Sequence, residues 1–152
     1  VVQAPARSFA LPSPQHRVNA TFQDVARLVG YDVTPPVPSR GEKLTVTLYW
    51  LAAGDYAGDE TVFVHLVDEG GRVRAQHDGP PVDGQRPTST WIAGEVVSDR
   101  HEVQLPADLP AATYTLKVGL YDQTTGRRVP IVSGSPNDQV ELGTIRIGPV
   151  RP

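Results

Sequence analysis

Residues 113–122 read TYTLKVGLYD, and apolar and polar side chains alternate along them. A period of two places alternate side chains on opposite faces of a β-strand. The inward set here is Tyr114, Leu116, Val118 and Leu120. Residues 44–50, LTVTLYW, repeat the pattern, and their inward set is Leu44, Val46, Leu48 and Trp50. Both stretches predict antiparallel strands with one buried and one solvated face.

The rest of the chain continues this pattern outward from those two strands. β-forming segments are separated by turns that contain Gly or Pro, and none shows an apolar helical period longer than two turns. The expected strands cover 20–23, 26–33, 44–51, 61–68, 72–77, 95–105, 113–121, 127–132 and 139–147. Eight or nine short strands of this kind predict an all-β fold, an immunoglobulin-like antiparallel β-sandwich.

Three details of the expected strands follow from the same pattern. Residues 61–68, TVFVHLVD, are apolar on both sides, so this strand should be central in its sheet or covered on both faces. The alternation slips within QVELGTIRI, and a bulge at Gly143 would restore one inward face. Tyr114 follows the corner Leu109-Pro110, which indicates a tyrosine corner whose phenol hydrogen-bonds to the upstream backbone.

The composition limits the class of protein. A chain of 152 residues is about one domain long. Its 14 basic and 17 acidic residues give a net charge of -3, which argues against nucleic-acid binding through a basic patch. No apolar run approaches the ~18 residues of a membrane span. The absence of Cys excludes disulfides, thiol catalysis and Cys-based zinc sites.

Met is also absent, which indicates either a processed mature chain or a domain cut from a longer protein, and both interpretations stay open. Asn is scarce as well, and a chain poor in Asn, Cys and Met fits a thermophilic bacterial origin. The twelve Arg against two Lys are equally the result of GC-rich coding.

The first 18 residues differ from the rest, because they contain three Pro and no helical period. We expect an extended Pro-rich arm or linker over 1–18, a β-sandwich domain over 19–148 and a short tail over 149–152. The arm carries apolar side chains that a solvated linker has little reason to carry: Val1, Val2, Phe9 and Leu11. The arm is either a tether to an upstream segment or a strand docked on a sheet edge. That edge belongs to its own domain or to an identical subunit. Docking on identical subunits, repeated head to tail, would give a filament.

The chain lacks the common catalytic motifs: GxSxG, GxGxxG, a P-loop and HExxH. Asp99 and His101 share the inward parity of their strand, and His65 lies in a facing apolar strand. We interpret these three residues as a buried polar cluster; the alternative is a metal site or an acid–base pair. The acidic residues scatter over turns, so no glycosidase pair is identified. We expect no catalytic residue, no cofactor and no metal.

Aromatic side chains offer a second kind of site. Trp91 lies in a loop that enters a strand, and Tyr49, Tyr56 and Tyr121 occupy outward or loop positions. Exposed rings stack on sugar faces, so these four residues predict a carbohydrate-binding surface with Trp91 as its platform. In the other interpretation, which we favour for Trp91, this residue folds back and closes one end of the sandwich.

A series of short segments carries a family resemblance. In order along the chain they are 28–32 (LVGYD), 48–50 (LYW), 63–68 (FVHLVD), 76–81 (QHDGPP), 87–91 (PTSTW), 94–95 (GE), 105–110 (LPADLP), 118–122 (VGLYD) and 125–127 (TGR). Over about residues 22–147 this order resembles a β-sandwich domain appended to bacterial, Chloroflexi-type membrane glycosyltransferases of the dolichyl-phosphate-mannose mannosyltransferase-like class. The resemblance implies an extracytoplasmic location. It implies no catalytic residue, because in that family the membrane part performs the glycosyl transfer.

The sequence therefore favours a non-catalytic, extracytoplasmic interaction or structural module over an enzyme. Such a module is either accessory to a membrane glycosyltransferase or a self-assembling, filament-type surface subunit that uses its N-terminal arm. The alternative is a carbohydrate-binding module. The expected partners are a neighbouring domain or identical subunits, and glycans in the alternative; nucleic acid and direct membrane insertion are not expected.

Overall fold

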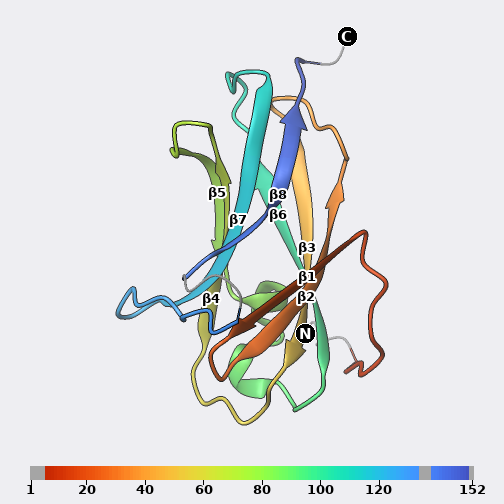
Figure 1. The fold of residues 1–152 in the computed structure, drawn as a ribbon, viewed down its shortest axis with the longest axis vertical. Helices are drawn as coiled ribbons and strands as arrows, with labels where there is room; N and C mark the ends of the chain where they lie inside the picture. Colours follow the sequence, from red (N-terminus) through yellow and green to blue (C-terminus); the bar gives the residue numbers. More distant parts are fainter. Residues whose placement is uncertain (1–5, 134–137, 151–152) are drawn as a thin grey trace.

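The computed structural model describes residues 6–133 and 138–150, and it consists of two four-stranded antiparallel sheets packed face to face (Figure 1). The first sheet has the order β1 (His16–Phe22), β2 (Ala26–Thr34), β3 (Lys43–Ala52), β6 (Val96–Gln104). The second has the order β5 (Val73–Gly79), β4 (Glu60–Val67), β7 (Ala112–Asp122), β8 (Val140–Ile147). The expected all-β sandwich is confirmed.

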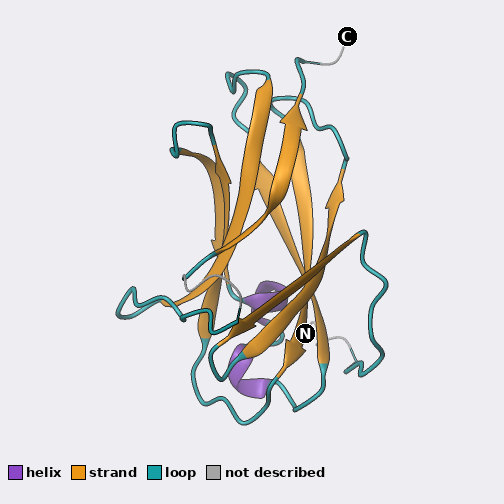
Figure 2. Ribbon diagram, in the orientation of Figure 1, coloured by secondary structure: helices purple, strands orange, loops and turns teal. Residues whose placement is uncertain are grey.

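In the part of the chain that the structure describes, helical structure is limited to two short 3-10 turns, η1 (Pro81–Gly84) and η2 (Thr88–Thr90), which lie together between β5 and β6 in the chain (Figure 2). Within the described residues, the structure has no helix that is long and apolar enough to cross a membrane.

The alternating strands bury the side chains that their pattern assigned to the core. The inward side chains of β3 are fully buried, and those of β7 are no more than 2% exposed. β4 lies between β5 and β7 and is covered on both faces, as its two-sided apolar sequence predicts. The rings of Phe22 and Trp50 meet edge to face, with centroids 5.3 Å apart, in the centre of this core.

Two local predictions are also confirmed. The Tyr114 hydroxyl donates to the Pro110 carbonyl at 2.6 Å, which is the hydrogen bond of a tyrosine corner. The register of β7 and β8 shifts beside Gly143, whose φ of 152° accommodates the irregular pairing. The bulge lets Ile145 and Ile147 point inward, and both are buried.

Most strands end within two residues of the prediction, but one strand begins earlier and one expected strand is absent. β1 begins at His16, ahead of the expected 20–23, because the polar residues that start it lie on an exposed sheet edge. Residues 127–132 do not form a strand. They make single bridges, from Arg128 to Tyr121 in the second sheet and from Ile131 to Phe22 in the first. This segment crosses between the sheets, and Pro130 lacks the N–H that a continuous ladder needs.

Candidate ligand-binding cleft

A cleft of about 450 Å³ opens at one end of the sandwich. Three connections meet there, the β1–β2 turn, the β3–β4 loop and the segment after β7, and all three lie toward the lower end of the molecule in Figure 1. The residues that line the cleft are Gln23, Asp24, Tyr56, Glu60, Asp122, Thr125, Arg127, Arg128, Val129 and Pro130.

Glu60 is the least solvated acid of the cleft, because only 6% of the residue is exposed. It starts β4 and pairs in register with Asp122, the last residue of β7. Its Oε1 accepts a hydrogen bond from the Tyr56 hydroxyl at 2.5 Å. Its Oε2 is buried and accepts no hydrogen bond from the described residues. An unpaired buried acceptor is costly for a fold, so a further donor brought to this oxygen would be stabilising.

Tyr56 is held as a hydrogen-bond donor. Burial raises the pKa of its phenol most, and the hydrogen bond to Glu60 and the charges of Glu60, Asp122 and Asp24 raise it further. The phenol therefore stays protonated across the neutral range. Its hydroxyl and the Glu60 carboxylate form one rigid polar edge of the cleft.

Other polar side chains of the cleft lie on or next to turns. Asp24 has a φ of 62°, in the left-handed region that Asp tolerates in turns. Asp122 Oδ1 accepts from the backbone amides of Thr124 (2.8 Å) and Thr125 (3.0 Å) and so fixes the turn after β7. Arg128 Nη1 contacts Asp138 Oδ1 at 3.2 Å, and its guanidinium lies 4.5 Å from the centroid of the Phe63 ring. The Arg127 side chain makes no ion pair with any described residue.

This lining suits a polyhydroxylated ligand better than an ion. Three carboxylates and two guanidinium groups leave one net negative charge, which strongly attracts neither a polyanion nor a polycation. Among the described residues no three or more His, Cys, Asp or Glu are placed to hold a metal ion. The cleft lining contains both donors and acceptors, and Val129 and Pro130 add apolar surface.

The predicted aromatic surface does not form around Trp91. The residue is only 4% exposed, its Nε1 donates to the Arg86 carbonyl at 2.9 Å, and its ring lies 6.2 Å from that of Trp50. Trp91 thus folds back and closes one end of the sandwich, and the platform prediction is corrected. The cause is the Arg86 carbonyl, which offers the indole a buried acceptor.

The three predicted tyrosines lie in three different places. Tyr49 is on the outer face of the first sheet, where its hydroxyl donates to Asp32 at 2.6 Å. Tyr121 is on the second sheet near Phe63, and its hydroxyl donates to Asp78 at 2.8 Å. Tyr56 alone of the three lines the cleft.

The predicted polar cluster keeps two of its three members. His101 Nε2 lies 2.6 Å from Asp99 Oδ2, and both residues are buried. The third member is His77, whose Nδ1 lies 3.0 Å from His101 Nδ1. His65 pairs in register with Gln76 and packs beside Phe63, with ring centroids 4.6 Å apart, on the other face of its sheet. Because side chains alternate along a strand, the register that turns His77 inward turns His65 outward.

Two of the four predicted arm residues can be placed. Phe9 is 55% exposed and Leu11 is 75% exposed. Val1 and Val2 lie outside the described residues. Ser8 bridges to Val96 on β6, so residues near the start of the described chain contact their own domain.

Comparison with known proteins gives a fold and no family. No protein-family model and no curated protein matches the sequence. The structure is similar to that described as the C-terminal domain of Wzt, with a TM-score of 0.59 and 13% identity over 92% of this chain and 83% of that one. A structure of AvmM, described as catalysing macrocyclization in alchivemycin A biosynthesis, aligns with a TM-score of 0.42 and 12% identity over 92% and 98%. Likeness to the Wzt domain at this identity shows the β-sandwich alone.

Proposed function

We propose that this chain is a non-catalytic, extracytoplasmic β-sandwich module that binds a saccharide in the cleft between Asp24, Tyr56, Glu60 and Arg127. The observation that carries the proposal is the Glu60 carboxylate, which is nearly buried, fixed by Tyr56 at one oxygen and unpartnered among the described residues at the other. A sugar hydroxyl supplies the missing donor, and a second hydroxyl can accept from Arg127.

The chemistry of the cleft supports binding rather than catalysis. Glu60 accepts a hydrogen bond from the Tyr56 hydroxyl, and Asp122 accepts one from the backbone of its own turn. The Tyr56 hydroxyl, which Glu60 holds in this hydrogen bond, has a pKa raised by burial and by the neighbouring carboxylates, so it is a poor nucleophile at neutral pH. The described lining of the cleft contains no Ser, Cys, His or Lys. The proposed role is therefore recognition of a glycan, carried out for a neighbouring domain that performs the chemistry.

That neighbour is proposed from the family resemblance of the sequence. A β-sandwich next to a membrane glycosyltransferase would hold the acceptor or product glycan outside the membrane, close to the transferase. Fractionation of the source cells, with an antibody to the chain, tests the location directly. Recovery with the cytoplasmic fraction would contradict the extracytoplasmic part of the proposal.

The binding part is tested with a glycan array followed by calorimetric titration of the best ligand. Glu60→Gln replaces the unpartnered oxygen by an amide group and keeps an oxygen for Tyr56, so we expect affinity to fall at least about tenfold with little change in stability. Tyr56→Phe should act in the same direction. Tyr49→Phe is the matched control, because it removes a phenol that donates to a carboxylate outside the cleft.

Salt dependence distinguishes a neutral sugar from a charged ligand. Binding of a neutral saccharide should change little between low and high ionic strength, because few ions are displaced. An array without ligands, or Glu60→Gln with the affinity of the unmodified chain, would contradict the proposal.

A further inference from the structure

The N-terminal segment is anchored on the first sheet through two neighbouring residues. Ser8 forms an antiparallel bridge with Val96 at the free edge of β6, and the Val96 amide donates to the Ser8 carbonyl at 2.7 Å. Arg7 Nη1 donates to Glu95 Oε1 at 2.6 Å and to the Thr90 carbonyl at 2.8 Å. A main-chain bond at a sheet edge together with a side chain in a specific site is how an extended segment is recognised by strand addition.

The domain itself builds the site that receives Arg7. The Glu95 side chain is 2% exposed. Its Oε2 accepts from Arg86 Nη1 at 2.7 Å, and its Oε1 accepts from the Ile92 amide at 3.0 Å. A buried carboxylate requires several donors, and Arg7 completes the set. All of these contacts except that of Arg7 come from the loop before β6, so the site does not depend on the residues that connect Arg7 to β1.

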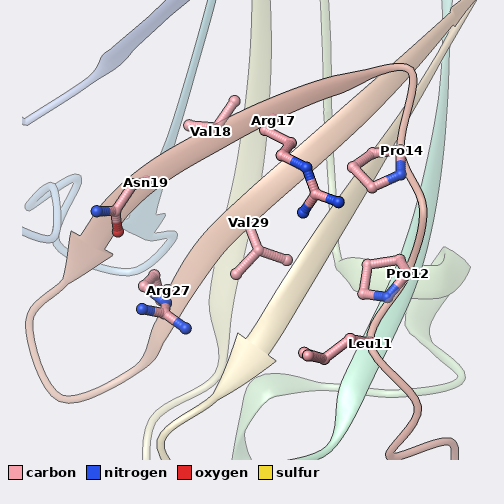
Figure 3. A pocket seen from close by; sticks show the side chains of 8 residues that line it. All are labelled: Leu11, Pro12, Pro14, Arg17, Val18, Asn19, Arg27 and Val29. Carbon is pink, nitrogen blue, oxygen red and sulfur yellow. The ribbon is translucent and has the colours of Figure 1, made fainter.

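The connection between this anchor and β1 is loosely packed. The loose stretch ends at Pro14, which packs closely on Gly30: a Cβ added at Gly30 would come within 2.3 Å of the proline ring. Between Ser8 and Pro14 the chain exposes Phe9 and Leu11 by 55% and 75%. Figure 3 shows Leu11, Pro12 and Pro14 on one side of a hollow of about 240 Å³, and side chains of β1 and β2 on the other. The anchor is therefore separable from the domain to which the chain connects it.

We propose that the Glu95–Val96 edge also receives Arg7 and Ser8 from a second copy of this chain. When two copies exchange Arg7 and Ser8, the contacts of these residues with Glu95 and Val96 stay the same. Only the path of the connecting residues 9–13 changes. In such an assembly the connecting segments run between the subunits and bury Phe9 and Leu11, which a monomer leaves in water. Reciprocal exchange closes a dimer, and one-way exchange extends an open chain.

The sequence contains no cysteine, so engineered disulfides report the pairing without background. Ser8→Cys and Val96→Cys place one cysteine on each partner of the bridge, where antiparallel Cα atoms lie close enough for a disulfide. Oxidation of a mixture of the two single variants should give a covalent heterodimer. The double variant should give covalent dimers or longer products whose share rises with protein concentration. Ser8→Cys with Arg100→Cys, farther along β6, is the control and should remain unlinked.

Light scattering on the unmodified chain gives the second readout. Its mass should rise with concentration, and Arg7→Ala should weaken association about tenfold or more, because a charge-assisted hydrogen bond is lost. Arg7→Lys retains the charge and should retain part of the association. A monomeric mass at every concentration, with disulfides only within single chains, would overturn the proposal. A rising mass without crosslinks between copies would assign association to another surface and overturn it equally.

Discussion

His77 on β5 and His101 on β6 join the two sheets of the sandwich, with 3.0 Å between their Nδ1 atoms. Asp99 Oδ2 lies 2.6 Å from His101 Nε2, and Asp99 also accepts from Trp50 Nε1 at 3.2 Å and from the Val82 amide at 2.8 Å. A carboxylate so placed favours the tautomer of His101 with the proton on Nε2. Nδ1 of His101 then accepts from His77, and a continuous polar chain runs from the core to the half-buried edge of β5.

Removal of His77 should therefore weaken the fold. His77→Phe keeps a ring but leaves His101 Nδ1 without its donor, so we expect the free energy of unfolding to fall by about 1–3 kcal/mol. Chemical denaturation measures the change. Gln76→Ala, at the exposed neighbouring position of β5, is the control and should stay within about 0.5 kcal/mol of the unmodified chain. Equal stability of His77→Phe and Gln76→Ala would show that the link between the sheets contributes nothing.

The tyrosine corner gives a second stability prediction. Tyr114→Phe removes the 2.6 Å hydrogen bond to Pro110 and leaves the packing of the ring unchanged. The free energy of unfolding should fall by about 1–2 kcal/mol. Tyr121→Phe removes a solvent-exposed bond to Asp78 and serves as the comparison, with a change of less than about 0.5 kcal/mol. Thermal or urea unfolding measures both variants. Equal losses in the free energy of unfolding would show that the tyrosine corner does not stabilise the fold.

His65 predicts a pH dependence of stability. Desolvation beside Phe63 lowers the pKa of His65 most; Arg128 lowers it further and Asp78 partly offsets this. Since the folded pKa lies below the unfolded value of about 6.5, the unfolded state binds the proton first. The free energy of unfolding should therefore fall as the pH drops from about 6.5 toward the folded pKa of His65.

The contribution of His65 is measured as a difference between the unmodified chain and a variant at this position. His65→Gln carries no titrating group at this position, and its stability should decline less steeply than that of the unmodified chain below pH 6.5. Urea unfolding at intervals between pH 7.5 and pH 5 gives both curves. Parallel curves would mean that His65 has the same pKa in both states.

The features predicted correctly from the sequence are those with a local signal. Two-residue alternation assigns the inward side of β3 and β7 without reference to any other strand, and a corner before Tyr114 is enough to predict its hydrogen bond. The segment 127–132 has β-forming residues, yet its partners lie in two different sheets. Its local pattern cannot show that it crosses from one to the other.

The cleft depends on residues that are distant in the sequence. Glu60 and Asp122 meet because β4 pairs with β7, and Asp24 joins them only when the sheets are stacked. Scattered turn acids give no sign of this. One missed residue did have a signal: His77 shares the parity of Ala75, which is buried, and so it belonged to the inward face of β5. A short polar strand such as β5 has too few apolar residues for the alternation to identify its inward face before the register is known.

Substitution of Trp91 tests the two interpretations of this residue, a buried core side chain and an exposed sugar platform. As a buried side chain that packs near Trp50 and hydrogen-bonds to the Arg86 carbonyl, it should behave as part of the core. Trp91→Ala should then lower the free energy of unfolding by about 3–5 kcal/mol, because a large cavity and an unpaired carbonyl remain. Trp91→Phe keeps much of the ring and should lose less. Both tryptophans are nearly inaccessible, so the emission of the native chain should lie at short wavelength and resist aqueous quenchers. A solvated sugar platform predicts the reverse: long-wavelength emission, efficient quenching and a Trp91→Ala variant as stable as the unmodified chain.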